Sequence, residues 1–370
     1  MAVNRAALIT AAAVLSCCGL TAFAQPPPLA RPQSMPTGTD TLKHYEFLLE
    51  SYRVADVRAA VRELSGFSEA QVKQVTRRWF SAAGAPGMTN ATPEQLKLAA
   101  MLHTDCAFAT LGRRGALGEH LTLAQSLADA AEPGMPPAGS FRRRWYLTAL
   151  MFLHRAGQRN LAETIRDAAL AAFPTDARIL LEAGAIDEDW AIRLEPSPLY
   201  LFNDEGLEKV RALRQGYLYG ADLYLRRAVA ADAALTEAAL RLAHVRAESG
   251  HRDEAAAGLQ QILDSPSVPE FRYLAALFLG QAHEADGRLD DARRLYRAAL
   301  DLYPRSQVAR TALAHMTFRQ GQAADALALV REALTIRAEK DDEDPWWRYP
   351  KNQFLSFDDL LVGLREEARR

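Results

Sequence analysis

Small and apolar residues recur at helical spacing between residues 276 and 304. Spacings of three and four place such residues on one face of a helix. Those on a first helix are Leu279 and Gly280, and those on a second helix are Ala292, Tyr296 and Ala299. Gly287 separates the two runs and predicts a turn, and Pro304 predicts the end of the second helix. The segment is therefore expected to form a helix-turn-helix unit.

The same unit returns along the chain. Gly250, Gly287 and Gly321 mark successive turns. An alanine recurs at one site of successive second helices, in steps of 34, 37 and 34 residues: Ala221, Ala255, Ala292 and Ala326. This pattern resembles the tetratricopeptide repeat family, whose unit is a helix-turn-helix of about 34 residues. The resemblance implies an all-α fold, a right-handed superhelical solenoid of such repeats, in which Gly280 lets two helices approach closely.

The pattern divides the chain into segments. A first repeat has its turn at Gly157 and departs from the family pattern at Arg166, where an aromatic residue or leucine is usual. Pro196 and Pro198 interrupt the second repeat, which implies an insertion. The predicted segments are residues 41–131, a helical region; 141–195, a repeat and a restart; 196–216, the insertion; 217–337, the regular array; and 338–370, an acidic and aromatic segment with a capping helix. Whether residues 41–131 are degenerate repeats is left open by the pattern.

The C-terminal segment joins an acidic run to three aromatic residues, Trp346, Trp347 and Tyr349. The acidic run lacks the spaced ligands and the central glycine of a helix-loop-helix calcium loop, which favours a solvated face. We expect the aromatic residues to cover the open end of the last repeat, because a solenoid end exposes apolar surface. An aromatic anchor for a partner is the alternative. Ser356 is expected to cap a final helix.

The N-terminus has the features of an export signal over residues 1–24. These features are Arg5, the apolar stretch Ala6–Leu15 and the small-residue site Ala22-Phe23-Ala24. Cleavage there starts the mature chain at Gln25, ahead of a proline-rich linker over residues 25–40. The apolar stretch is shorter than the ~20 residues that span a bilayer. We therefore expect the protein to be exported, and so periplasmic or secreted.

An alternative reading of this terminus concerns its cysteines. Residues 14–17 resemble a bacterial lipobox, in which Cys17 carries lipid and the protein is a membrane-anchored lipoprotein. Contact with a membrane is expected only in that case. Cleavage after Ala24 instead leaves Cys106 as the one cysteine of the mature chain, which excludes an internal disulfide. Cys106 lies in an apolar helical pattern and is expected to be buried.

Composition and charge limit the classes of partner. The chain has 370 residues, 49% of them hydrophobic and 24% charged, which is enough apolar surface for a continuous core. Its formal net charge is −2 at pH 7. No overall basic field attracts nucleic acid, so we expect no nucleic-acid partner.

Catalytic motifs are not found. His283-Glu284 is followed by Gly287, where a metal-binding helix needs a second histidine. The chain has no G-x-S-x-G nucleophile elbow and no G-x-x-x-x-G-K-[ST] phosphate loop. His103, Asp105 and Cys106 form the one tight cluster of chemically competent residues. We predict no catalytic residue, metal or cofactor, and keep an enzyme using the His103 region as the distant alternative.

The family resemblance also implies a function. Tetratricopeptide repeats bind ligands on the concave face built by their first helices. The positions there are Arg144, Leu147, Met151, His154, Leu240, His244, Leu277, Gln281, Thr311, His315 and Phe318. The expected partner is another protein or an extended peptide. We therefore expect a non-enzymatic binding scaffold exported to the cell envelope, with a lipid-anchored envelope or secretion assembly factor as the alternative.

Overall fold

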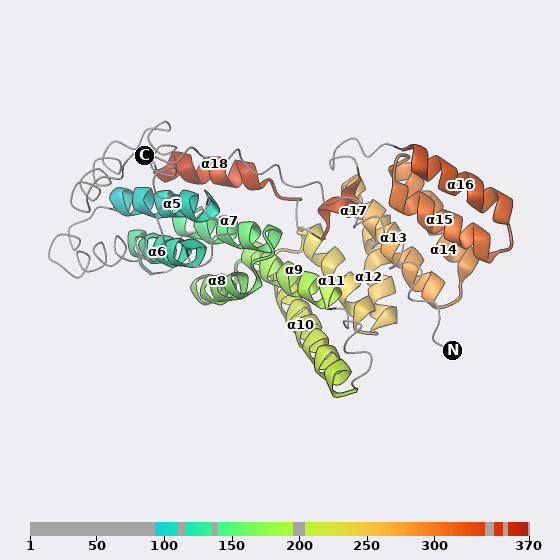
Figure 1. Cartoon of the computed structure of the whole chain (residues 1–370), viewed down its shortest axis with the longest axis horizontal. Coiled ribbons are helices and arrows are strands. Elements are labelled where there is room, and N and C mark those ends of the chain that lie inside the picture. Colours follow the sequence, from blue (N-terminus) through green and yellow to red (C-terminus); the bar gives the residue numbers. More distant parts are fainter. Residues whose placement is uncertain are drawn as a thin grey trace.

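The computed structural model describes residues 93–109, 116–134, 139–194, 204–336, 344–350 and 354–368. Every element assigned in these residues is an α-helix, and the helices follow one another along an elongated molecule (Figure 1). They pack in pairs: α5 (Pro93–Ala109) with α6 (Ala116–Ala131), α7 (Phe141–Arg155) with α8 (Arg159–Ala172), α9 (Ala177–Arg193) with α10 (Asp204–Ala231), α11 (Thr236–Glu248) with α12 (Arg252–Asp264), α13 (Pro269–Ala285) with α14 (Leu289–Leu302), and α15 (Gln307–Arg319) with α16 (Ala323–Thr335). The predicted all-α solenoid of helical repeats is confirmed.

The first helices of the pairs form one layer, in which α7 contacts α9, α9 contacts α11 and α11 contacts α13. Each second helix before α16 packs on its own partner and on the first helix of the next pair, whereas α16 packs on α15 at the end of the array. This nearest-neighbour packing is the defining property of a solenoid. We call α7, α9, α11, α13 and α15 the inner layer, and α8, α10, α12, α14 and α16 the outer layer.

Local sequence signals set where the helices begin and turn. Ser140, Asp176 and Ser306 each precede an inner helix, and their side chains accept hydrogen bonds from backbone N–H groups of its first turn. The turns within four pairs contain a glycine with φ between 66° and 88°: Gly157, Gly250, Gly287 and Gly321. Glycine adopts this left-handed conformation without steric strain. The four predicted turns are confirmed.

Two glycines allow inner and outer helices to approach closely. A Cβ built on Gly280 would lie 2.5 Å from Cε1 of Tyr296, the aromatic residue of its partner helix. A Cβ on Gly184 of α9 would lie 2.5 Å from Cγ of Leu225 in α10. The contact therefore repeats between pairs, although many more residues separate Gly184 from Leu225 than separate Gly280 from Tyr296.

The pair of α9 and α10 accommodates extra residues within a helix, which the sequence did not predict. The sequence assigns residues 196–216 to an insertion, but residues 204–216 are the first half of α10. The two prolines precede the helix, so they do not interrupt its hydrogen bonding. The first half of α10 projects from the body of the molecule, and most of its side chains are exposed (Figure 1). The insertion therefore lengthens an outer helix.

Arg166 is accommodated by a polar contact. Its Nη1 lies 2.5 Å from Oδ1 of Asp187, and both side chains are largely buried. Burial raises the pKa of Asp187 to about 7, and Arg166 opposes that shift. An ion pair between α8 and α9 therefore takes the place of the aromatic packing usual at this position.

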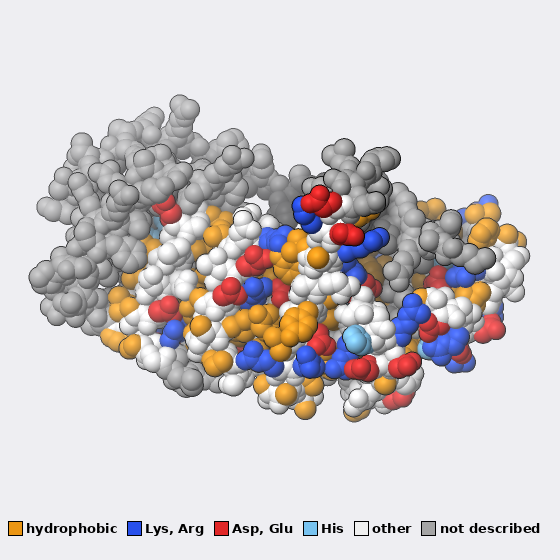
Figure 2. Space-filling view, turned by 90° about the horizontal axis from the view of Figure 1, so that it is seen from below, with side chains coloured by type: hydrophobic (Ala, Val, Ile, Leu, Met, Phe, Trp, Pro, Cys, Tyr) orange, Lys and Arg blue, Asp and Glu red, His pale blue; other side chains and the backbone are white. Residues whose placement is uncertain are grey.

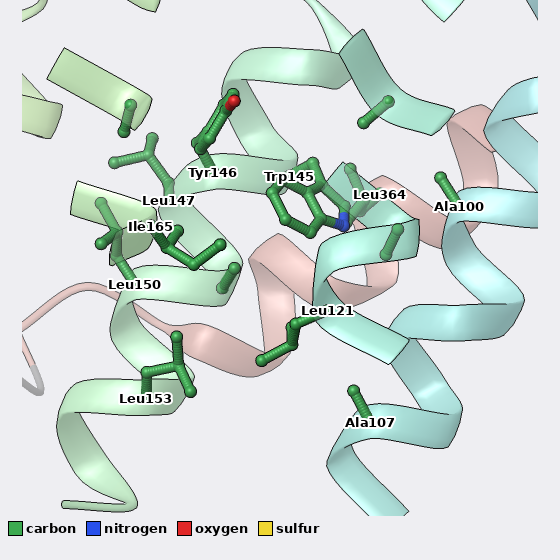
Figure 3. Packing of buried hydrophobic residues seen from close by; sticks show 14 of the residues in the cluster. Ala100, Ala107, Leu121, Trp145, Tyr146, Leu147, Leu150, Leu153, Ile165 and Leu364 are labelled. Carbon is green, nitrogen blue, oxygen red and sulfur yellow. The ribbon is translucent and has the colours of Figure 1, made fainter. Parts of the chain in front are cut away.

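The N-terminal core is built from elements far apart in sequence. Trp145 of α7 is fully buried and its Nε1 donates to Oγ1 of Thr104 in α5 at 2.8 Å. Figure 3 shows Trp145 between α5, α7 and Leu364, which comes from the last helix of the chain. Of the predicted region 41–131, only residues 93–109 and 116–131 are described, and they form the pair α5 and α6. The predicted signal and linker, residues 1–40, lie outside the described residues.

The C-terminal segment corrects one prediction. α17 (Pro345–Arg348) packs on α13, and α18 (Phe357–Ala368) packs on α5 and α7 (Figure 1). Trp346 and Tyr349 contact Phe278 of the inner layer, with ring centroids 5.9 and 5.1 Å apart. These two residues and the predicted capping helix therefore do not cover the last repeat, whose outer helix α16 exposes apolar residues. Ser356 does cap α18, accepting the N–H of Asp359 at 3.2 Å.

Candidate interaction groove

Histidine and carboxylate side chains pair across the inner layer. Each pair joins two neighbouring first helices. The pairs are His154 Nε2 with Asp189 Oδ2 at 3.3 Å, His244 Nδ1 with Glu188 Oε1 at 2.6 Å, and His315 Nδ1 with Glu284 Oε1 at 3.1 Å. Between α11 and α13 the ring of His244 instead stacks on Phe278, with centroids 4.1 Å apart. Polar side chains therefore line the face formed by the first helices.

Glu188 is the centre of a buried polar network. Its Oε2 accepts from Nη1 of Arg241 at 2.8 Å, and Nε of Arg241 donates to Glu237 at 3.0 Å. Burial alone raises the pKa of the Glu188 carboxyl, but Arg241 and His244 outweigh burial and hold that pKa below its usual value. The carboxyl is therefore ionised at neutral pH and is a strong hydrogen-bond acceptor.

Tyr349, from the C-terminal segment of the same chain, packs into this network. The Tyr349 hydroxyl donates to Oε1 of Glu188, and Nη2 of Arg241 donates to the backbone carbonyl of Tyr349 at 2.8 Å. The Arg241 guanidinium also lies over the Tyr349 ring, 4.3 Å from its centroid. Tyr349 is 3% exposed, and burial and Glu188 together raise its pKa well above the usual value. The inner layer thus recognises an aromatic ring, a hydroxyl and a main-chain carbonyl at one place.

Further contacts place the C-terminal segment along the inner layer. At its start, the Tyr273 hydroxyl donates to Oδ1 of Asp344 at 2.7 Å. Arg155 of α7 donates to the carbonyl of Leu355 at 3.3 Å. The segment ends at α18, where ion pairs join Arg365 to Asp105 of α5, and Glu367 to Arg144 of α7 and Lys97 of α5. The described parts of the C-terminal segment therefore contact the predicted concave face at α13, α11, α9 and α7.

The structure separates the predicted site residues into two groups. Leu147, Met151, His154, Leu240 and Leu277 are buried, Arg144 pairs with Glu367, and the ring of His244 contacts Tyr349. Gln281, Thr311 and His315 are partly exposed, and Phe318 is 62% exposed. We call these last four residues the open stretch. The remaining predicted positions are covered by packing or by the C-terminal segment.

Sequence reasoning missed Glu188 and Arg241, and it assigned Tyr349 to the open end of the last repeat and not to this network. One signal was present, since Asp187, Glu188 and Asp189 are consecutive acids in an otherwise apolar helix. Three consecutive positions cover most of a helix circumference, so at least one carboxylate must turn toward packed surface. A buried carboxylate requires a charged or hydrogen-bonding partner. The three acids therefore predict buried ion pairs, although not the residues that make them.

The His103 cluster is buried. Nδ1 of His103 lies 3.0 Å from Nδ1 of His120, and burial lowers the pKa of His120 to about 4. Asp105 pairs with Arg365. Cys106 is buried as predicted, and burial raises its pKa well above the usual value, which leaves the unreactive thiol. No group of three metal-ligating side chains occurs in the described part of the chain.

Surface charge and helix character add two observations. In Figure 2, which views the face from which α10 projects, basic and acidic side chains alternate and neither sign gathers into a patch. Among the helices that the structure describes, none has the length and apolar character needed to cross a bilayer.

The chain is similar to known tetratricopeptide repeat proteins. Two family models described as tetratricopeptide repeat match residues 240–307 and 284–347. A crystal structure of MamA protein is 18% identical, with 52% of this chain and 90% of that chain covered and a TM-score of 0.38. A tetratricopeptide repeat protein from Parabacteroides merdae ATCC 43184 is 15% identical, with 73% of this chain and 92% of that chain covered and a TM-score of 0.42. No curated protein matches the sequence.

The matched residues coincide with the most regular part of the solenoid. Residues 240–347 run from α11 to α17 and include the turns at Gly250, Gly287 and Gly321. Gly280 lies within the first match, and Tyr296, the residue it lies against, lies within both. Repeat spacing, helix pairing and the two family models agree, and they identify residues 240–347 as tetratricopeptide repeats.

Proposed function

We propose that the protein is a non-catalytic scaffold that binds a segment of another protein along its inner layer. Tetratricopeptide repeats generally mediate protein–protein interaction, which supports a protein partner. The observation that carries the proposal is that the inner layer already receives a polypeptide segment through an aromatic ring and a main-chain carbonyl. The open stretch continues the same face beyond that segment and offers a partly exposed amide, hydroxyl and imidazole with an exposed phenyl ring.

A triple variant tests this function. Gln281→Ala, His315→Ala and Phe318→Ala together remove polar and apolar contacts of the open stretch without touching the buried core. We expect capture of the main partner to weaken at least tenfold, a loss of about 1.4 kcal/mol. Circular dichroism should show unchanged helical content. The matched control is Tyr219→Ala, which removes an exposed aromatic ring from the outer helix α10. Equal capture by both proteins would contradict the proposal.

We further propose that the scaffold works in the cell envelope after export. Support comes from the signal features of residues 1–24, with cleavage after Ala24. The intact mass of the protein isolated from its own cells should correspond to a chain starting at Gln25, and Cys17→Ala should leave that mass unchanged. A diacylated chain starting at Cys17 would instead support the alternative, a lipid-anchored envelope or secretion assembly factor.

A further inference from the structure

We propose that residues 344–350, which we call the strap, are an internal ligand that a partner displaces by presenting a tyrosine to Glu188, Arg241 and His244. This rests on the proposed function, because it assigns the chemistry of the segment that the inner layer receives. The partner is a protein whose bound segment carries an unphosphorylated tyrosine. The strap itself supplies the template for that segment.

The buried polar network stays paired when the strap leaves. Glu188 keeps its contacts with Arg241 and His244, and Arg241 keeps its contact with Glu237. The Tyr273 hydroxyl keeps Oγ of Ser306 at 2.7 Å. Water can solvate the ionised groups that become exposed. Breaking a buried ion pair is destabilising because it leaves a buried charge without a partner. Removal of the strap leaves each of these buried charges with a partner, so it avoids that cost.

The helix that follows the strap, α18, is attached to the fold by its own contacts. α18 is held by apolar packing, since Leu364 and Ala368 are buried in the same cluster as Trp145. Leu360 and Leu361 pack against that cluster. Apolar burial of this kind stabilises the docked helix. α18 is therefore held by apolar contacts that do not involve the strap, so a partner can displace the strap while α18 stays docked.

The Tyr349 site selects for the tyrosine side chain. The Tyr349 hydroxyl donates to an ionised carboxylate, and its backbone carbonyl accepts from Arg241. Phenylalanine would fill the ring site but leave Glu188 without that donor. A phosphotyrosine would place about two negative charges beside the Glu188 carboxylate and would be repelled. The site therefore distinguishes tyrosine from both of its close analogues.

The strap has a second contact point five residues earlier. Asp344 accepts the Tyr273 hydroxyl, and Trp346 lies against Phe278. Arg348 pairs with Glu270 at 3.3 Å. A competing segment with an acidic residue upstream of its tyrosine would reproduce the Asp344 contact. The probe that best matches these contacts is the strap sequence itself.

The experiment uses the full chain and fluorescent synthetic peptides of residues 341–353. In the wild-type protein the tethered strap has a high effective concentration and excludes the peptide. Tyr349→Ala removes the anchor of the tethered strap. We expect this variant to bind the peptide at least tenfold more tightly than the wild type does. Versions of the peptide with Phe or phosphotyrosine in place of its tyrosine should bind the variant at least tenfold more weakly.

Controls separate displacement from unfolding. Val362→Ala removes an exposed side chain from α18 and should bind the peptide as the wild type does. Tyr349→Phe keeps the ring and should give intermediate binding. Equal peptide binding by wild type and Tyr349→Ala would overturn the proposal, and so would loss of helical content in both Tyr349 variants, because the strap would then be a permanent part of the fold.

Failure of the internal ligand and failure of the proposed function would give different experimental results. A natural partner that is lost in the triple variant of the open stretch but bound equally by wild type and Tyr349→Ala would uphold the function and overturn the internal ligand. Conversely, peptide binding at the strap site combined with unchanged partner capture by the triple variant would uphold the internal ligand and remove the open stretch from the proposed function.

Discussion

At the N-terminal end of the described solenoid, α5, α6 and α18 pack on α7, whereas at the C-terminal end α16 exposes apolar side chains. Leu327, Val330 and Leu334 lie at helical spacing on α16 and are 50%, 38% and 76% exposed. A repeat buries its apolar face only against its neighbours, so each end of an array has unsatisfied apolar surface. Here that surface is covered at one end by the preceding pair and by α18, which is distant in sequence, and is left exposed at the other.

The difference shows where the C-terminal segment contributes stability. Its last helix, α18, packs on α5 and α7 at the beginning of the described array. There Arg365 pairs with Asp105, which lies 260 positions earlier in the sequence. Contacts of such long separation must overcome a large loop-closure entropy, which apolar burial around Leu364 offsets. The described N-terminal end should therefore be the more stable region and the C-terminal end the more adaptable one.

The largest expected effect comes from the covered end. Trp145→Ala removes a fully buried indole and leaves Oγ1 of Thr104 without its donor. We expect the free energy of unfolding to fall by about 3–5 kcal/mol. Chemical denaturation of the wild type and the variant measures this difference. A loss below about 1 kcal/mol would mean that the N-terminal cluster is loosely packed and would break the comparison.

Acid should weaken the covered end before the exposed one. Burial lowers the pKa of His120 to about 4, and burial and His120 lower the pKa of His103. Below pH 6.5 the unfolded chain therefore binds protons that the folded chain does not, so the free energy of unfolding falls as the pH decreases toward 4. For His120 alone the loss is about 3 kcal/mol.

A double variant isolates this contribution. His103→Leu with His120→Leu removes the titrating pair while keeping apolar volume between α5 and α6. Denaturation midpoints at pH 7 and pH 4.5 should differ less in the double variant than in the wild type. The same pH dependence in both proteins would show that acid sensitivity arises elsewhere.

A glycine pair tests the regular array between the two ends. Gly280→Ala forces the Tyr296 ring to move, because the new Cβ would lie 2.5 Å from Cε1. Overpacking of this kind costs about 1–3 kcal/mol. The matched control is Gly216→Ala in α10, where no atom lies within 4 Å of the new Cβ. Because alanine favours a helix, the control should gain about 1 kcal/mol. Equal thermal stabilities of the two variants would contradict the assigned packing.

The fold was predictable where the contacts are local. The turns at Gly157, Gly250, Gly287 and Gly321 and the contact between Gly280 and Tyr296 all follow from residues close in sequence. α10 was not predicted, because the two prolines that suggested an insertion say nothing about the helix that begins after them. Periodicity reports which face of a helix is apolar, and it does not report how long an outer helix is.

The site was predictable only in part. Register placed His154, His244 and His315 on the face of the inner layer, but their rings pair with carboxylates of the chain itself. The return of the C-terminal segment depends on pairings such as Tyr349 with Glu188, which lie 161 positions apart. No local pattern encodes such a pairing. The sequence therefore indicates which face of the solenoid is in contact with a segment, whereas the structure is needed to identify that segment as the C-terminal one.

The smallest expected effect comes from the exposed end. Leu334 on α16 is 76% exposed, so Leu334→Ser removes little buried area and should change the free energy of unfolding by no more than about 0.5 kcal/mol. The same denaturation series that measures Trp145→Ala provides the value. Ala333→Ser, one position earlier and buried, is the matched control and should be the more destabilising change, since it places a hydroxyl among apolar atoms. A loss at Leu334 as large as that at Trp145 would mean that α16 is covered in solution. Both ends of the solenoid would then be covered, and the comparison between a covered end and an exposed end would be wrong.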